Sequence, residues 1–210
     1  MTREVATFPC KYSIFIKYMN ANGELSSRLV DINRFTYSSE GNFVGFCHKR
    51  KMSRTFSFVN VLEVTDAITG EILNPAELHN YLYDIYQQSP ESELDEFISE
   101  YQKVIEILEY ISICDGSVVI SERRAIVTWI LETAHLSDDL QEYAMKIVKN
   151  WKTPEKSDFI RAILWVARFQ PEMRDVLLQQ AEIVAHADKK LHSEEIYALN
   201  YLKRIFNLSK

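Results

Sequence analysis

The period of the hydrophobic pattern changes once along this chain, near residue 74, and that change constrains the fold more than any other feature. Before it, short stretches rich in β-branched and aromatic residues, such as "YSIFIKYM" and "RTFSFVNVLEV", alternate with the turn sequences "NANG", "SEGN" and "ITGE". Such stretches are typical of β-strands. After it, apolar residues recur every three or four positions, as they do in helices.

The region before residue 74 predicts about five short strands, which is typical of a small SH3-like barrel or sheet. The "NANG" sequence predicts a tight hairpin turn, because Asn and Gly tolerate its backbone angles. The sequence "KRKMS" is expected to form the loop between two later strands.

The region after residue 74 carries repeated helix-start signals, in which a polar cap often precedes Pro or an acidic first turn. The expected starts are Asn74, Ser89, Ser121, Ser137, Thr153, Gln170 or Pro171, and Ser193. We therefore expect an α+β chain of two domains. Its parts are a β-domain over 1–73, a connector helix over 74–92, and an all-helical domain over 93–210.

Residues 106–137 and 179–209 form an internal repeat. In each copy an apolar helix ends at an Asp, a short loop follows, and a new helix starts at Ser-Glu. The matching pairs are Asp115 with Asp188, Ser121-Glu122 with Ser193-Glu194, and Leu136-Ser137 with Leu208-Ser209. This agreement predicts two copies of one helix–loop–helix unit packed on a shared core.

The Asp-loop-Ser-Glu pattern has a structural and a functional interpretation. In the structural one, Asp turns the loop and Ser caps the next helix. In the functional one, the carboxylates of both loops together bind a divalent cation, because Ca²⁺ takes about six to eight oxygen ligands and one loop offers too few. The candidate ligands are Asp115, Glu122, Asp188 and Glu194.

Charge is distributed unevenly along a chain whose net charge is −6. The sequence "FCHKRKMSRTF" over 46–56 holds four Lys or Arg and a histidine, whereas residues 55–102 hold none and ten Asp or Glu. This basic run has three interpretations: a solvated turn, a surface that docks against the acidic stretch, or an anion site. As an anion site it would use the planar guanidinium groups of Arg50 and Arg54, which bind phosphate through two parallel hydrogen bonds. The side chains expected to add hydrogen bonds or stacking are His48, Thr55 and Tyr18.

Residues 10–73 resemble a WYL domain, an SH3-like fold that senses ligands in bacterial regulators, often of defence or DNA-damage systems. The resemblance rests on "IKYMNANGE", "FVGFCHKRKMSRTFSF" and "VNVLEV". It implies a basic pocket lined by Cys47, His48, Arg50, Arg54 and Phe56. The Trp-Tyr-Leu triplet of that family is "GNF" here, and its later Arg is Asn60.

Residues 95–210 resemble a TerB-type domain, the all-helical module of tellurite-resistance-associated proteins. The resemblance rests on "CDGSVVISERRAI" and "AHADKKLHSEEIYAL". It implies a link to stress responses and divalent-cation binding by Asp115, Glu122, Asp188 and Glu194. The first copy has Gly116 after its Asp, and the second has Lys189 there.

No catalytic signature is present in the sequence, since GxSxG, HExxH, P-loop and GxGxxG patterns are absent and only five Gly occur. We therefore expect no enzyme activity. The three Cys match no CxxC spacing, and the longest apolar run, "AILWVA", is far too short to span a bilayer. A cytoplasmic protein without membrane insertion is expected.

The sequence thus predicts a stress- or defence-related sensor or adaptor. Its β-domain would bind an anionic ligand, either a nucleotide or a short single-stranded nucleic acid. Its helical domain would relay binding to a protein partner, with an oligomer as an open alternative. The alternative function is a scaffold whose helical domain binds a divalent cation, while the β-domain mediates protein interaction only.

Overall fold

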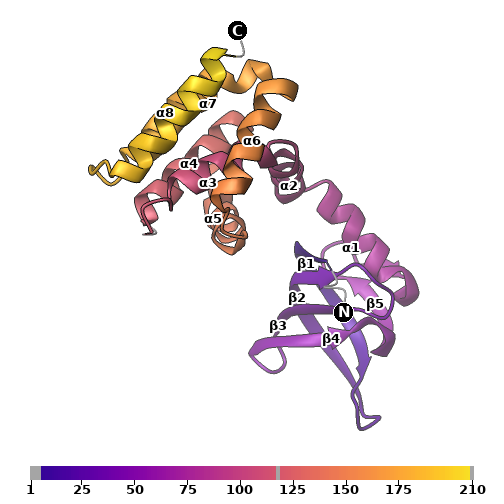
Figure 1. Cartoon of the computed structure of the whole chain (residues 1–210). Coiled ribbons are helices and arrows are strands. Elements are labelled where there is room, and N and C mark those ends of the chain that lie inside the picture. The colour runs from indigo at the N-terminus through magenta and orange to yellow at the C-terminus, as the bar shows by residue number, and fades with distance from the viewer. Residues whose placement is uncertain (1–5, 117–118, 209–210) are drawn as a thin grey trace. The chain divides into compact units, whose positions relative to one another are not determined.

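The computed structural model describes residues 6–116 and 119–208, and it divides into two compact units (Figure 1). Residues 1–92, here called the β-unit, contain the sheet and one helix, and residues 93–210, the helical unit, are built from helices. The change of period near residue 74 therefore predicted the order of the two kinds of structure.

The β-unit is a six-stranded antiparallel sheet in the order β4-β3-β2-β1-β5-β6. Its strands are β1 (Thr7–Met19), β2 (Leu25–Thr36), β3 (Asn42–Cys47), β4 (Met52–Ser57), β5 (Val61–Asp66) and β6 (Ile72–Leu73). The sequence "RTFSFVNVLEV", expected as one strand, is divided by a 3₁₀ turn, η1 (Phe58–Asn60). That turn carries the chain from one edge of the sheet to the far side of β1.

Of the barrel and the sheet that the sequence left open, the described residues form an open sheet. In the described part of the chain, β4 and β6 form the two edges and do not pair with each other. Closure needs a continuous ladder, and β6 has only two residues with which to extend one. The sheet still curls, which brings the end of β4 close to β1: the Ser57 N–H donates to the Tyr18 hydroxyl, 3.3 Å away.

Helix α1 (Leu78–Gln87) packs on β1 and β2 and completes the core of the β-unit. The Asn74 side chain accepts a hydrogen bond from the Ala76 N–H and so caps the short 3₁₀ turn, η2 (Pro75–Glu77), that leads into it. Leu78, Leu82 and Tyr86 are spaced four apart, which places them on one face, and all three are buried with the sheet residues. The segment expected as a connector is therefore part of the β-unit core.

A polar contact also ties α1 to the sheet. The Tyr12 hydroxyl of β1 donates to Asp66 of β5 and lies 2.9 Å from the Tyr81 hydroxyl of α1. Asp66 is buried and also accepts the Ile68 and Thr69 N–H groups of the following turn. The Tyr12 hydrogen bond first, and then these backbone donors, lower the pKa of Asp66 to about 2.

Changing Tyr12 to Phe should make the β-unit less dependent on pH between about 4 and 2. A depressed folded-state pKa stabilises the fold above the unfolded pKa of about 3.9, and this contribution is lost as the pH falls toward 2. When the Tyr12 hydrogen bond is removed, the pKa of Asp66 rises, so the stability of the β-unit changes less with pH in this range. Hydrogen exchange of the sheet amides at several pH values measures this change in stability. Tyr81→Phe, which removes a hydroxyl that does not contact Asp66, should keep the wild-type slope, and an unchanged slope in Tyr12→Phe would contradict the assignment.

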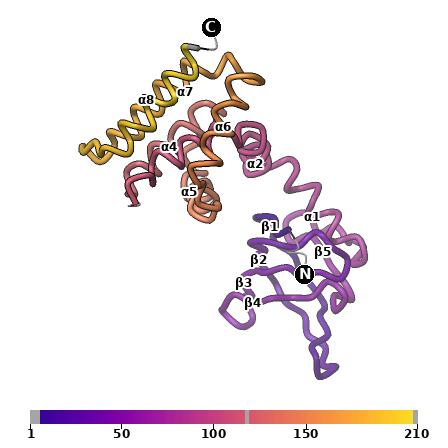
Figure 2. The backbone as a smooth tube through the Cα atoms, viewed as in Figure 1, coloured from indigo at the N-terminus to yellow at the C-terminus, as the bar shows by residue number. Residues whose placement is uncertain are grey.

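The helical unit places α3 in its centre, packed on α6 and α7. Its helices are α2 (Pro90–Glu100), α3 (Gln102–Ile111), α4 (Ile120–Thr133), α5 (Gln141–Asn150), α6 (Lys156–Phe169), α7 (Arg174–Ala185) and α8 (Ser193–Leu208). Figure 2 traces α7 and α8 side by side. Helices α3–α4 and α7–α8 are the two copies of the sequence repeat, although Ser209 at its end lies outside the described residues.

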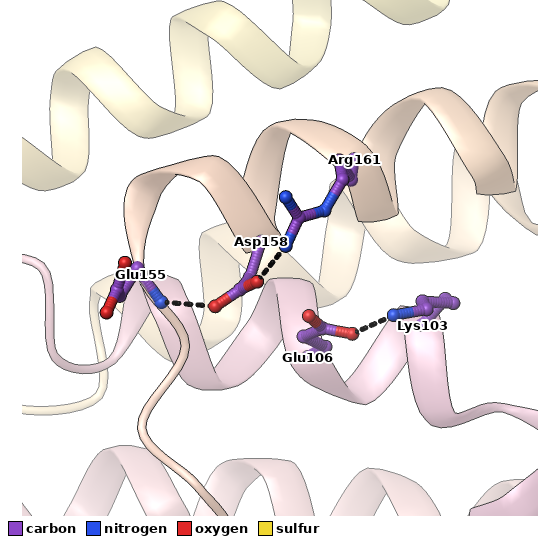
Figure 3. Close-up of polar contacts among 5 residues, drawn as sticks. All are labelled: Lys103, Glu106, Glu155, Asp158 and Arg161. Atoms are coloured by element: carbon purple, nitrogen blue, oxygen red, sulfur yellow. Dashed lines mark hydrogen bonds and ion pairs between the residues drawn. The ribbon is translucent and has the colours of Figure 1, made fainter.

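The helix-start signals are largely confirmed. Ser137 caps a 3₁₀ turn before α5, α2 begins at Pro90, and α8 begins at Ser193. Helix α6 begins later than Thr153 predicted, because Glu155 and Asp158 form a reciprocal capping box (Figure 3). The described residues contain no helix that is both long and apolar enough to cross a membrane.

Candidate functional site

The β-unit holds a cavity of about 330 Å³ between the β1–β2 hairpin, β2, β4 and η1. It is lined by Tyr18, Asn20, Ala21, Asn22, Arg28, Arg54, Thr55, Phe56 and Asn60. Of the five predicted anion-site residues, Tyr18, Arg54 and Thr55 are therefore brought together.

Strand alternation explains how polar side chains reach this cavity. Alternate residues of a strand share one face, so Tyr18 continues the row of buried Ile14 and Ile16 in β1. By the same rule Arg28 continues the row of Val30 and Ile32 in β2, and Arg54 that of Phe56 in β4. Each core-facing row thus ends in a polar or aromatic residue at the mouth of the cavity.

Arg28 is the main residue that sequence reasoning missed. Its guanidinium carbon lies 5.6 Å from the centre of the Tyr18 ring and 5.7 Å from that of Phe56. Its Nε donates to Ser26 Oγ at 3.0 Å. Stacking on aromatic faces holds a guanidinium in place while leaving its outer N–H groups available. The inward row of β2 was the sequence signal that pointed to Arg28.

The cavity is electrostatically unbalanced. Across residues 6–116 and 119–208, no carboxylate forms an ion pair with Arg28 or Arg54, whereas Lys17 of the same unit pairs with Glu63 at 2.8 Å. The cavity lining contains no acidic side chain, and its remaining polar members are amides and hydroxyls. Two cations beside neutral hydrogen-bonding groups favour an anion, above all one with a planar or tetrahedral set of oxygens.

His48 and Arg50 lie outside the cavity. His48 Nε2 is 2.6 Å from Asp31 Oδ2, and Asp31 also accepts a hydrogen bond from Ser13 at 2.7 Å. The hydrogen bonds from Ser13 and His48 hold the pKa of Asp31 below its usual range. Arg50 sits in the exposed turn between β3 and β4, so its side chain is an ordinary solvated cation there.

The second candidate site lies in the helical unit, where the two loops of the repeat bring acidic side chains together. We call Asp115, Glu122, Asp188 and Glu195 the acidic cluster. Glu122 and Glu195 are buried, each close to one end of its helix. Burial first, and then repulsion by Glu195, Asp188 and Asp115, raises the pKa of Glu122 to about 7. Burial also raises the pKa of Glu195.

Glu194, which was predicted as a cation ligand, is not one of the buried carboxylates. It is exposed, accepts a hydrogen bond from Ser193 Oγ at 2.7 Å, and has a lowered pKa for that reason. Glu195 takes the inward position, where it accepts the His192 N–H at 2.7 Å. The spacing could have shown this, because each inward Glu follows its loop Asp by seven residues.

The residue directly after Asp has the same backbone conformation in both loops, although its type differs. Gly116 has φ of 86° and Lys189 has φ of 67°, so both adopt the left-handed conformation directly after Asp. The Asp188 carboxylate accepts the Lys190 N–H at 2.7 Å, which is the turn-forming role of the structural interpretation. Across the loops, His192 Nε2 lies 3.5 Å from Asp115 Oδ2.

The acidic cluster does not form a ready ligand set for a metal ion. In the part of the chain that the structure describes, no group of three or more His, Cys, Asp or Glu side chains is arranged so that it could hold one. Burial first, and then the neighbouring carboxylates, raise the pKa values of Glu122 and Glu195, and cation binding stays a prediction.

One comparison with known proteins gives a match. The sequence model described as tellurite resistance protein TerB matches residues 102–210, just over half of the chain. No curated protein and no solved structure matches the chain. The matched segment runs from α3 to the end of the chain and includes both loops of the acidic cluster, and it does not extend into the β-unit. The chain therefore belongs to the TerB family, through its helical unit.

Proposed function

We propose that this chain is a non-enzymatic, stress- or defence-related adaptor whose β-unit binds a phosphate-bearing ligand. One observation carries the proposal: Arg28 and Arg54 meet at the mouth of one cavity without a carboxylate partner among the described residues. The resemblance of residues 10–73 to WYL domains supports the same assignment. The helical unit would pass the bound state on to a protein partner.

A nucleotide or a short single strand suits the lining best. The two guanidinium groups offer planar forks to phosphate oxygens, and Asn22 and Asn60 offer donors and acceptors to a sugar or base edge. The cavity volume of about 330 Å³ falls within the range of small-molecule sites. Charge and neutral hydrogen bonds together account for both affinity and orientation.

Changing Arg54 to Ala should weaken binding of labelled single-stranded DNA, RNA or nucleotides by roughly tenfold or more, because a charge-assisted contact is removed. Fluorescence anisotropy at two salt concentrations measures the affinity, and wild-type binding should weaken with salt. The matched control is Arg50→Ala, which removes the same charge from the turn outside the cavity and should have a small effect.

Two results would contradict the proposal. Equal losses in Arg54→Ala and Arg50→Ala would mean that binding follows net charge rather than the cavity. No wild-type binding to any member of the panel would leave the cavity without the proposed ligand. Arg28→Gln serves as a second variant, with circular dichroism to show that the sheet remains folded.

A second candidate function is divalent-cation binding by the helical unit, which is favoured by the repulsion within the acidic cluster. A cation would relieve that repulsion, so Ca²⁺ or Mg²⁺ should raise the melting temperature of the wild type. The same ions should stabilise Glu122→Gln much less. Equal stabilisation of both proteins would place any cation outside the cluster.

A further inference from the structure

Helix α6 is apolar on two faces, and the described part of the helical unit covers only one of them. Its inner face buries Phe159, Ala162, Ile163, Val166 and Ala167 in the core of the helical unit. Its outer face nevertheless carries Leu164, Trp165 and Phe169, which are 52%, 37% and 57% exposed. A helix at the surface of a globular unit normally places polar residues there, so three large apolar side chains in two turns mark a surface that contacts something else.

Two arginines accompany these apolar residues on the same face. The Arg161 side chain is 70% exposed and forms an ion pair with Asp158 in the first turn, as Figure 3 shows. The Arg168 guanidinium lies 5.1 Å from the centre of the Phe169 ring, and the Trp165 and Phe169 rings are 5.4 Å apart. Trp and Arg are the residues that most often dominate the energy of protein interfaces. We call Arg161, Leu164, Trp165, Arg168 and Phe169 the outer α6 face.

The outer α6 face carries two arginines in a unit whose net charge is negative. Residues 93–210 hold fifteen Lys or Arg and twenty Asp or Glu, so the unit as a whole is acidic. This overall charge repels nucleic acids and anionic membranes, which need a broad basic surface. The outer α6 face instead matches a partner surface that is apolar and carries a few acidic side chains.

Two of the surfaces that a second copy could offer, its own outer α6 face and its α2, fit poorly. Two outer α6 faces packed on each other would bring Arg161 and Arg168 of one copy against the same residues of the other. The acidic exposed residues of α2, Glu93, Glu96 and Glu100, would supply charge but no apolar side chains to cover Trp165 and Phe169. The occupant must offer both kinds of group.

We infer that the outer α6 face docks an acidic amphipathic helix of a partner protein. Its leucine-like side chains cover Leu164, Trp165 and Phe169, and its carboxylates meet Arg161 and Arg168. The inference rests on the protein partner of the proposed function, and it names the surface and the chemistry that bind this partner. It does not depend on the anion cavity, because all of its residues lie in the helical unit.

Site-specific photocrosslinking in cells that naturally express the chain tests the inference. A photoreactive phenylalanine replaces Leu164 in the full chain, and mass spectrometry identifies the crosslinked segment. The matched control places the same group at Val176, which is 44% exposed on α7. We expect a protein segment rich in Asp, Glu and Leu at position 164 only, with a yield that falls at least about fivefold in Arg161→Glu/Arg168→Glu.

The affinity is then measured with that segment, as a labelled synthetic peptide, by fluorescence anisotropy. Trp165→Ala should weaken binding by roughly tenfold or more, and Val176→Ala should not. A crosslink to a second copy, to RNA or to lipid would overturn the inference, as would a basic segment or a yield no higher than at Val176. Arg54→Ala should leave the crosslink intact, so failure of the anion cavity and failure of the docking surface give different results.

Discussion

Replacing Leu82 with alanine is expected to lower the free energy of unfolding of the β-unit by about 3 kcal/mol. Leu82 is fully buried between α1 and the sheet, where Leu78 and Tyr86 flank it one helical turn away on either side. Truncation removes its apolar contacts and leaves a cavity that the neighbouring strands cannot fill. Native-state hydrogen exchange of the sheet amides measures the loss.

Two comparisons make the Leu82 result specific. Ile68→Ala removes a similar side chain that is 81% exposed, so it should change the β-unit stability little. All three tryptophans of the chain, Trp129, Trp151 and Trp165, lie in the helical unit, so urea unfolding followed by their fluorescence reports on that unit alone. Its midpoint should be unchanged in Leu82→Ala. An unaltered exchange rate in the sheet would mean that α1 is a connector after all.

Replacing Glu122 with glutamine is expected to stabilise the helical unit by roughly 1–2 kcal/mol at pH 8 and by almost nothing at pH 4. The pKa of Glu122 is raised to about 7 by burial and by the other carboxylates of the acidic cluster. Between its unfolded pKa of about 4.3 and pH 7, the unfolded chain loses this proton while the folded chain keeps it. Stability therefore falls as the pH rises through this range, and above pH 7 the cost stays constant. Glutamine keeps the shape and removes the charge.

Urea unfolding followed by tryptophan fluorescence at pH 4, 6 and 8 tests the Glu122 prediction. The matched control is Glu194→Gln, the exposed neighbour whose pKa is lowered by Ser193. It should be neutral or slightly destabilising at pH 8. A Glu122→Gln variant that is less stable than wild type at pH 8 would show that the ionised carboxylate has a favourable partner.

Local signals predicted the elements better than they predicted which side chains line the cavity of the β-unit. Asn74 and Ser137 marked helix starts because capping depends on a few neighbouring residues. Ser193 is the first residue of α8, and its hydroxyl donates to Glu194. Tyr18, Arg54 and Thr55 line one cavity, whereas His48 and Arg50, which the basic run and the WYL resemblance grouped with them, lie outside it. Arg28 was missed because nothing near it in the chain is basic or aromatic.

The amino-acid sequence by itself determined the order of sheet and helices, the turns, the repeat and the charge pattern. Each of these depends on periodicity or on backbone preferences over a few residues, which the sequence displays directly. Only the tertiary structure decided which strand ends meet. The curl of the open sheet brings Arg28 of β2 beside Arg54 of β4, and the packing of two loops selects Glu195 over Glu194. Such contacts join residues far apart in the chain, so their energies are set by packing rather than by local preference.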